Sequence, residues 1–122
     1  MTLDLVIHGL PSCNSAAAVH WRKRHAERQA WKSHVTGAVL AKLGRFPSKP
    51  LERARVTLTR CSSQEPDADN LASSFKFVLD GLKLAGVIED DKPSCIGTPE
   101  FRWEKTGPKV GCVRIRVEEV AT

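Results

Sequence analysis

Acidic residues cluster at both ends of the stretch DADNLASSFKFVLDGLKLAGVIEDD, which covers residues 67–91. Asp67, Asp69 and Asn70 open it, and Asp90 and Asp91 close it. Carboxylate oxygens with no His or Cys ligand pair suit a hard cation, Mg²⁺ or Mn²⁺, far better than zinc. Such an ion could polarise a phosphodiester and activate the attacking water. The stretch therefore predicts metal-assisted phosphodiester hydrolysis.

Two further charged residues lie between these acidic ends. Lys76 and Asp80 are four positions apart, which places them on one face of a helix. A lysine there could balance the charge that builds up in the transition state. The ordinary alternative is that the opening acidic residues cap a helix, which stabilises it by about 1 kcal/mol, and that the closing pair is a solvated turn. The residue types leave both interpretations open.

The net charge of +5 is unevenly distributed along the chain. Residues 1–61 contain 11 Lys or Arg against 3 Asp or Glu, whereas residues 62–122 contain 8 against 11. A nuclease needs cations to gather a polyanion and carboxylates to hold a metal beside it, although ordinary solvated surface charge has the same totals. The densest cationic segment is the candidate DNA-binding region, where an aromatic ring could stack on bases. Its members are Trp21, Arg22, Lys23, Arg24, Arg28 and Lys32.

The apolar residues predict the elements that must hold these groups, because they alternate in some segments and recur at helical spacing in others. Strands are expected at 3–10, 53–60, 95–104 and 110–120, and helices at 31–43 and 71–86. In the basic segment 20–28, charged residues occupy the positions that would continue the apolar stripe of the first helix. This segment cannot bury that face, so it is expected to be an exposed helical extension or an arm. The order β-α-β-α-β-β predicts a fold of the α/β (α+β) class, with a small mixed sheet of about four strands and two main helices packed on it.

The chain of 122 residues is expected to form a single domain, residues 1–122. Its four cysteines show neither zinc-ligand spacing nor a dense disulfide framework, so we expect reduced, mostly buried thiols. The first residues have no basic region and only a short apolar run, so neither a signal peptide nor a membrane span is expected. These features favour a cytoplasmic protein.

The acidic stretch resembles the RusA-type Holliday junction resolvase family, whose members carry D-x-D-N, then K-x-x-x-D-x-L, then a Gly and a D-D pair. Here these elements are Asp67, Asp69 and Asn70, then Lys76, Asp80 and Leu82, then Gly86, Asp90 and Asp91. The early LPSCN, with Pro11 and Asn14, and the basic HWRKRHAERQAW also look like the family's N-terminal part. One departure is the spacing from Asn70 to Lys76, which is six positions here and about three residues shorter in some members.

The resemblance implies a Mg²⁺-dependent homodimeric endonuclease, acting in a bacterial or phage-infected cell, that resolves four-way branched DNA by paired incisions. It implies Asp67, Asp69 and Asp91 as metal ligands, Asp90 as an additional candidate, and Lys76 beside the scissile phosphate. Asn14 joins the candidate DNA-binding residues, and Mn²⁺ is an alternative metal. Two other functions compete with this one. They are a noncatalytic branched-DNA-binding protein with the same fold, and a protein-interaction module whose acidic residues only cap helices.

The expected helix 71–86 would hold the two acidic clusters apart. At ~1.5 Å per residue it is about 24 Å long, and the five steps from Gly86 to Asp91 reach at most about 17 Å. We therefore expect Asp91 to complete the metal site of a second subunit. Phe77 and Leu84 lie seven positions apart and off the main apolar stripe, which makes them candidates for the subunit interface. Alternatively, they widen the buried face of the helix.

Overall fold

The computed structural model describes residues 2–8, 21–65, 68–107 and 111–120, and it leaves the side chains at 21–25, 27 and 68–74 undescribed. The described elements are β1 (Thr2–His8), α1 (Trp21–Leu43), β2 (Ala54–Ser62), α2 (Ala68–Leu84), α3 (Pro93–Ile96), β3 (Glu100–Lys105) and β4 (Cys112–Glu119). The predicted order of strands and main helices is confirmed. The fold is the expected α+β arrangement of helices on a mixed four-stranded sheet.

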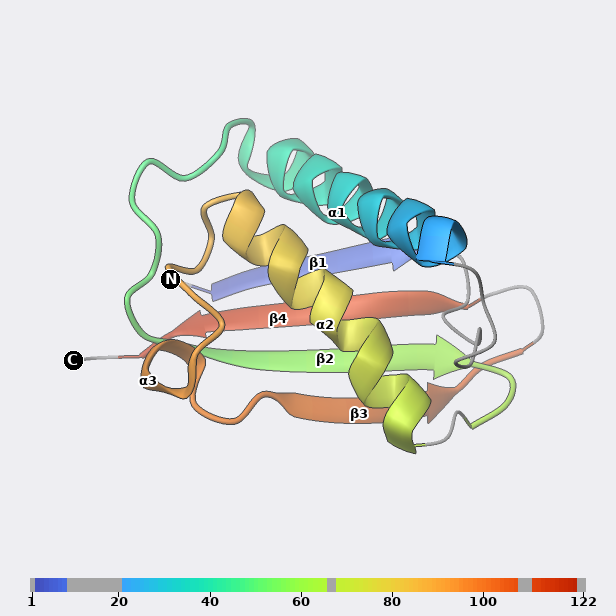
Figure 1. Cartoon of the computed structure of the whole chain (residues 1–122). Coiled ribbons are helices and arrows are strands. Elements are labelled where there is room, and N and C mark those ends of the chain that lie inside the picture. The colour runs from blue at the N-terminus through green and yellow to red at the C-terminus, as the bar shows by residue number, and fades with distance from the viewer. Residues whose placement is uncertain (1, 9–20, 66–67, 108–110, 121–122) are drawn as a thin grey trace.

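The sheet has the strand order β1-β4-β2-β3. Strand β4 lies antiparallel to both β1 and β2, whereas β3 runs parallel to β2 at the edge of the sheet. Helices α1 and α2 both cover the same face (Figure 1). The opposite face carries no helix in the described part of the chain, and we call it the open face.

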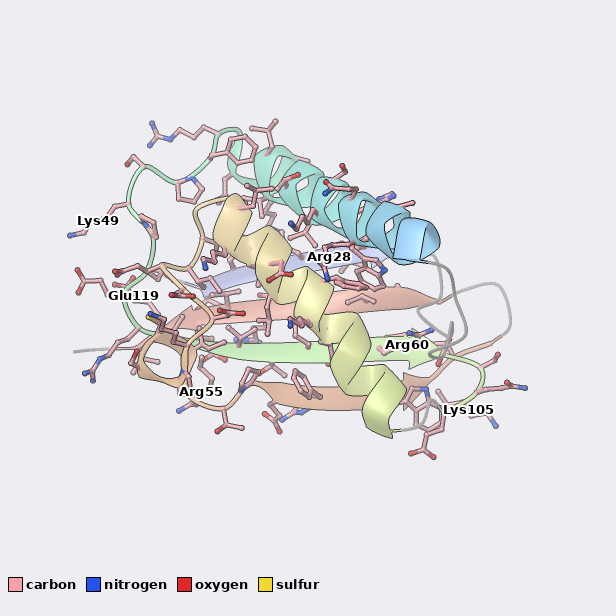
Figure 2. All side chains as sticks on the ribbon, viewed as in Figure 1. Arg28, Lys49, Arg55, Arg60, Lys105 and Glu119 are labelled. Carbon is pink, nitrogen blue, oxygen red and sulfur yellow. The ribbon has the colours of Figure 1, made fainter. Side chains whose placement is uncertain are left out.

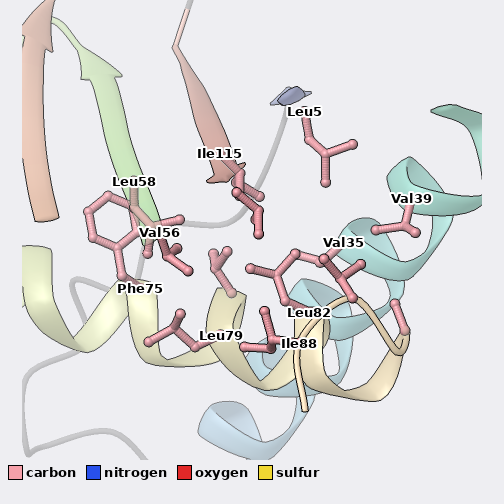
Figure 3. Packing of buried hydrophobic residues seen from close by; sticks show 14 of the residues in the cluster. Leu5, Val35, Val39, Val56, Leu58, Phe75, Leu79, Leu82, Ile88 and Ile115 are labelled. Carbon is pink, nitrogen blue, oxygen red and sulfur yellow. The ribbon is translucent and has the colours of Figure 1, made fainter. Parts of the chain in front are cut away.

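Strict alternation in the strands sends apolar side chains toward the helices. In β1, Leu3, Leu5 and Ile7 are buried while the residues between them are exposed, and β4 repeats the pattern with Val113, Ile115 and Val117. All six belong to one core cluster with residues of both helices. Figure 3 shows two of them, Leu5 and Ile115, facing the side chains of α1 and α2. A shift of one residue in register would turn this whole set toward solvent, so the core fixes the strand pairing.

Helix α2 buries the predicted apolar stripe, whose described members are Phe75, Val78, Leu79 and Leu82. It ends as expected, because Gly86 adopts a positive φ of 80° just beyond Leu84. Its start differs from the prediction, since the helix begins at Ala68 and not at Leu71. Asp69 and Asn70 therefore lie inside the first turn instead of preceding it. Acidic residues are favoured there as well, because the helix N-terminus carries a partial positive charge.

Helix α1 resolves the alternatives left open for the basic segment. The helix already begins at Trp21, so the segment from 21 onward is a helical extension and not an arm. Trp31, Val35 and Val39 form its buried stripe. The helix is long but polar, and among the described residues no helix is both long and apolar enough to cross a membrane.

The third predicted strand is shorter than expected. Residues 93–96 form the short helix α3, and β3 begins only at Glu100, whereas the alternation suggested a strand from 95. Pro93 stands in the first turn of α3, where its fixed φ is favourable. Gly97 follows with a positive φ of 60°, which ends the turn. Ile96 is buried as the core contact of α3, so its apolar character reflects a helical turn and not a strand.

Candidate metal centre and nucleic-acid interface

One end of the sheet gathers the starts of both long helices. Strands β1, β2 and β3 end there, and α1 and α2 begin there (Figure 1). We call it the helix-start end. Asp69 lies at this end, within the first turn of α2, although its side chain is outside the description. Asp67, which directly precedes α2, and Asn14 both lie outside the described residues.

Cations from three elements occur at the helix-start end. The first turn of α1 contributes the backbone positions of Arg22, Lys23 and Arg24. Figure 2 shows that Arg60, near the end of β2, and Lys105, at the end of β3, lie there as well. The same end of the sheet thus receives the acidic start of α2 and the basic start of α1.

Arg60 and Lys105 were not identified from the sequence as cations at the helix-start end. For Arg60 a signal was present, because it closes a predicted strand only a few residues before the acidic stretch. For Lys105 the signal was absent from the sequence. Its position depends on the parallel pairing of β3 with β2, which brings the carboxyl ends of both strands together, with Lys105 opposite Ser62.

Arg28 and Lys32 lie farther along α1, and both side chains lie against the protein surface. The guanidinium carbon of Arg28 lies 5.5 Å from the centre of the Phe77 ring on α2. This cation–π contact contributes about 0.5–1 kcal/mol for an exposed pair. Lys32 is half-buried. Both residues follow the basic first turn of α1. They would therefore extend its cationic surface along the helix, away from the helix-start end.

A charged stripe runs along α2 away from the helix-start end. Asp69, Lys76 and Lys83 are spaced seven positions apart, which keeps them on nearly the same face of the helix. Lys76 is exposed and Asp80, four positions on, is half-buried. Lys76 lies about 10 Å from Asp69 along the helix axis. That distance exceeds direct contact with an ion held at Asp69, but a lysine side chain and a DNA phosphate could bridge it.

Asp90 and Asp91 lie at the opposite end of the sheet, where β2 begins. Two backbone hydrogen bonds join Leu51 to the chain just before them, from Leu51 N to Val87 O at 3.0 Å and from Glu89 N to Leu51 O at 3.1 Å. Helix α2 has 17 residues, which span about 25 Å. Oxygen ligands of Mg²⁺ lie only about 2.0–2.1 Å from the ion. Asp69 and Asp91 of one chain therefore cannot share a single ion in this arrangement.

Asp90 is engaged by its neighbours. Its carboxylate lies 3.1 Å from Lys83 Nζ and 3.6 Å from Lys92 Nζ, and it accepts a hydrogen bond of 2.8 Å from the backbone N–H of Asp91. That backbone hydrogen bond, followed by the one from Lys83, lowers the pKa of Asp90 to about 2. A metal ion would have to compete with both lysines for Asp90. Asp91 is half-buried beside it.

The two candidate interface residues differ in their surroundings. Phe77 is 7% exposed and belongs to the core. It therefore widens the buried face of α2, which was the alternative to a subunit interface. The reason is that α1 covers it, as the contact with Arg28 indicates. Leu84 is 66% exposed in the last turn of α2. Leu84 thus remains the available apolar contact of the pair.

Within the described part of the chain, no three His, Cys, Asp or Glu side chains gather closely enough to hold a metal ion. The described acidic positions of the predicted site lie at opposite ends of the sheet, Asp69 at one end and Asp90 with Asp91 at the other. Comparison with known proteins adds no assignment, because no family model matches the chain and no curated protein matches it.

Proposed function

We propose that this protein is a Mg²⁺-dependent, structure-selective endonuclease that resolves four-way DNA junctions as a homodimer, a function of the RusA type. The observation that carries the proposal is that the acidic start of α2 and the basic start of α1 lie at the same end of the sheet, α1 beside the edge strand β1 and α2 beside the other edge strand, β3 (Figure 1). Charges of opposite sign at one end of a sheet provide what metal-assisted cleavage of a polyanion requires. The expected place of action is the cytoplasm of a bacterial or phage-infected cell.

The carboxylates of Asp67 and Asp69, joined by Asp91 of a second subunit, would hold the ion. When bound, Mg²⁺ would supply Lewis-acid polarisation of the phosphodiester and a lowered pKa for the attacking water. The basic residues of α1, with Arg60 and Lys105, would bind phosphates on either side and fix the register of the DNA. Lys76 would offset negative charge on the phosphate as it builds up.

The need for a second subunit follows from the length of α2. A helix of about 25 Å separates Asp69 from the segment of the same chain that carries Asp91. A two-fold dimer can bring the Asp91 end of one chain to the helix-start end of the other, and the same operation then completes a second site. Two symmetric sites also suit paired incisions in a four-way junction. Exposed Leu84, seven residues before Asp91, is suitably placed for the interface.

Cleavage of a synthetic four-way junction tests this proposal. We expect linear duplex products with Mg²⁺ or Mn²⁺, no products with EDTA, and none with Asp69→Asn. Glu89→Gln is the matched control, because it neutralises an exposed carboxylate next to the acidic pair and should leave cleavage unchanged. A wild-type protein that binds the junction but cuts it with no divalent ion would reject the enzyme function.

A noncatalytic branched-DNA-binding protein is the second candidate. The observations that favour it are the long spacing from Asn70 to Lys76 and the separation of Asp69 from Asp91. Both candidates predict binding that weakens steeply as salt increases, whereas a protein-interaction module predicts no such binding.

The cations of α1 provide a test of DNA binding that is independent of cleavage. Replacing Arg22, Lys23 and Arg24 together by Ala should reduce the slope of log K against log salt by up to about 0.9 per phosphate contact removed. Arg102→Ala is the control, because Arg102 lies on the open face, paired with Glu100 at 2.8 Å. Equal loss of binding in both variants would show that α1 is not the DNA-binding element.

A further inference from the structure

Two cysteines face each other on the open face of the sheet. Cys61 near the end of β2 is the direct register partner of Cys112, the first residue of β4. The neighbouring residue in each strand, Arg60 and Val113, points toward the helices, so both thiols point the other way. Neither cysteine forms a disulfide in this structure. This juxtaposition belongs to no part of the proposed nuclease site.

The backbone already has the dimensions that a disulfide needs. Directly opposite residues of antiparallel strands have Cα atoms about 4.5–5.5 Å apart, and disulfides join Cα atoms about 4.4–6.8 Å apart. The alternation of the strands places both side chains on one face of the sheet, directly opposite each other. The Cα separation of such a pair therefore falls within the range that a disulfide spans.

The two thiols differ in access to solvent. Cys61 is 4% exposed, whereas Cys112 is half-buried. Burial raises the pKa of Cys112, and the neighbouring Cys61 thiol raises it further. Among the charged neighbours, Arg114 lowers this pKa and Glu104 raises it; His8 of β1 is the register partner of Cys112 on its other side. An external reagent should thus meet Cys112 first, and more readily as the pH rises.

We propose that Cys61 and Cys112 are a dithiol site that forms a reversible intramolecular disulfide by exchange with a low-molecular-weight disulfide such as oxidised glutathione. The Cys112 thiolate attacks one glutathione sulfur, which forms a mixed disulfide and releases one glutathione thiolate. The Cys61 thiolate then attacks the Cys112 sulfur and expels the second glutathione. The protein loses two electrons and two protons, and two glutathione thiols result, so the exchange balances.

Oxidation would tie the end of β2 to the beginning of β4. These strands are already hydrogen-bonded neighbours, so the expected effect is a higher midpoint of thermal unfolding with the same fold. Because the attacking species is the thiolate, oxidation should accelerate as the pH is raised toward and beyond the ordinary thiol range. Treatment with dithiothreitol should restore the original midpoint.

The test uses the full chain and oxidised glutathione. After incubation at pH 8, free thiols are alkylated, and intact mass and peptide mapping are recorded without reduction. We expect the mass to fall by two hydrogen atoms, with the peptides of Cys61 and Cys112 linked. Cys95→Ser is the matched control, because Cys95 lies on α3 at the other end of the sheet and its replacement should leave the linkage intact.

Two variants make the order of steps measurable. Cys61→Ser should stop at a stable glutathione adduct on Cys112, and Cys112→Ser should prevent the linkage and leave Cys61 mostly unmodified. The wild-type peptide map remains decisive even if the buried Cys61 variant folds poorly. The proposal is overturned if wild-type protein shows no Cys61–Cys112 link at any glutathione ratio, or links these cysteines mainly to Cys13 or Cys95.

Discussion

Dimers that combine one Asp69→Asn chain with one Asp91→Asn chain should recover part of the activity that each variant lacks alone. In a site shared between subunits, Asp69 comes from one chain and Asp91 from the other. The mixed dimer then has one site with both substitutions and one site with neither. If each site were built within one chain, both sites of the mixed dimer would be defective.

The structure sets the expected magnitude. Helix α2, 17 residues long, spans about 25 Å between the two acidic positions, so a shared site is the only way for them to hold one ion in this fold. Each variant alone should lose at least about a hundredfold in rate, or about 2.7 kcal/mol of transition-state stabilisation. Random mixing makes about half of the dimers mixed, each with one intact site, so about a quarter of the wild-type sites should return in a two-fold dimer.

The assay mixes differently tagged chains by co-expression and isolates the mixed dimer through both tags. A labelled four-way junction then distinguishes a single nick from paired incision. The mixed dimer should nick one strand and fail to release paired products, because only one of its sites functions. Asp69→Asn mixed with wild type is the control, since it retains one functional site in either arrangement. Verified mixed dimers that do not nick, beside a nicking control, would refute the shared site.

Two further predictions concern the fold itself. Gly81→Ala should lower the free energy of unfolding by about 1–3 kcal/mol in urea, because an added Cβ would lie 2.7 Å from Val35 Cβ in α1. Gly37→Ala should raise it by up to about 1 kcal/mol, because the space around Gly37 is open. A change of the same sign in both variants would contradict the packing described. The pKa of Asp90, lowered to about 2, means that its stabilising effect is complete above its ordinary pKa of about 4 and is lost as the pH falls toward 2. Lys83→Gln should raise this pKa only in part in an NMR titration, because the backbone N–H of Asp91 remains; no change would exclude the Lys83 ion pair.

The elements that the sequence predicted well are those that the local pattern determines. The apolar stripe of α2 and the alternation of β1 and β4 each require only that one face of the element is covered. Such a face appears in the sequence as apolar residues that recur every 3.6 positions in a helix or every second position in a strand. The start of α2 was placed three residues late, because Asp69 and Asn70 fit both a cap and a first turn. Helix α3 was missed, because a single turn leaves too few residues to show a helical period.

The features that the sequence could not predict depend on which elements meet. Phe77 lies off the main stripe of α2, but α1 crosses there and buries it, which a helical wheel of α2 alone cannot reveal. The pairing of Cys61 with Cys112 depends on the register between β2 and β4, 51 positions apart in sequence. The position of Lys105 depends on parallel pairing at the sheet edge. The separation of the acidic ends by α2 was predictable, because helix length follows from residue count.

Junction cleavage with and without divalent metal tests the central proposal most directly. A synthetic four-way junction incubated with wild-type protein and Mg²⁺ should yield paired nicked duplexes, which EDTA and Asp69→Asn abolish and Glu89→Gln preserves. Junction binding without strand cleavage in Mg²⁺ and in Mn²⁺ would contradict the nuclease function and leave the noncatalytic DNA-binding protein in its place.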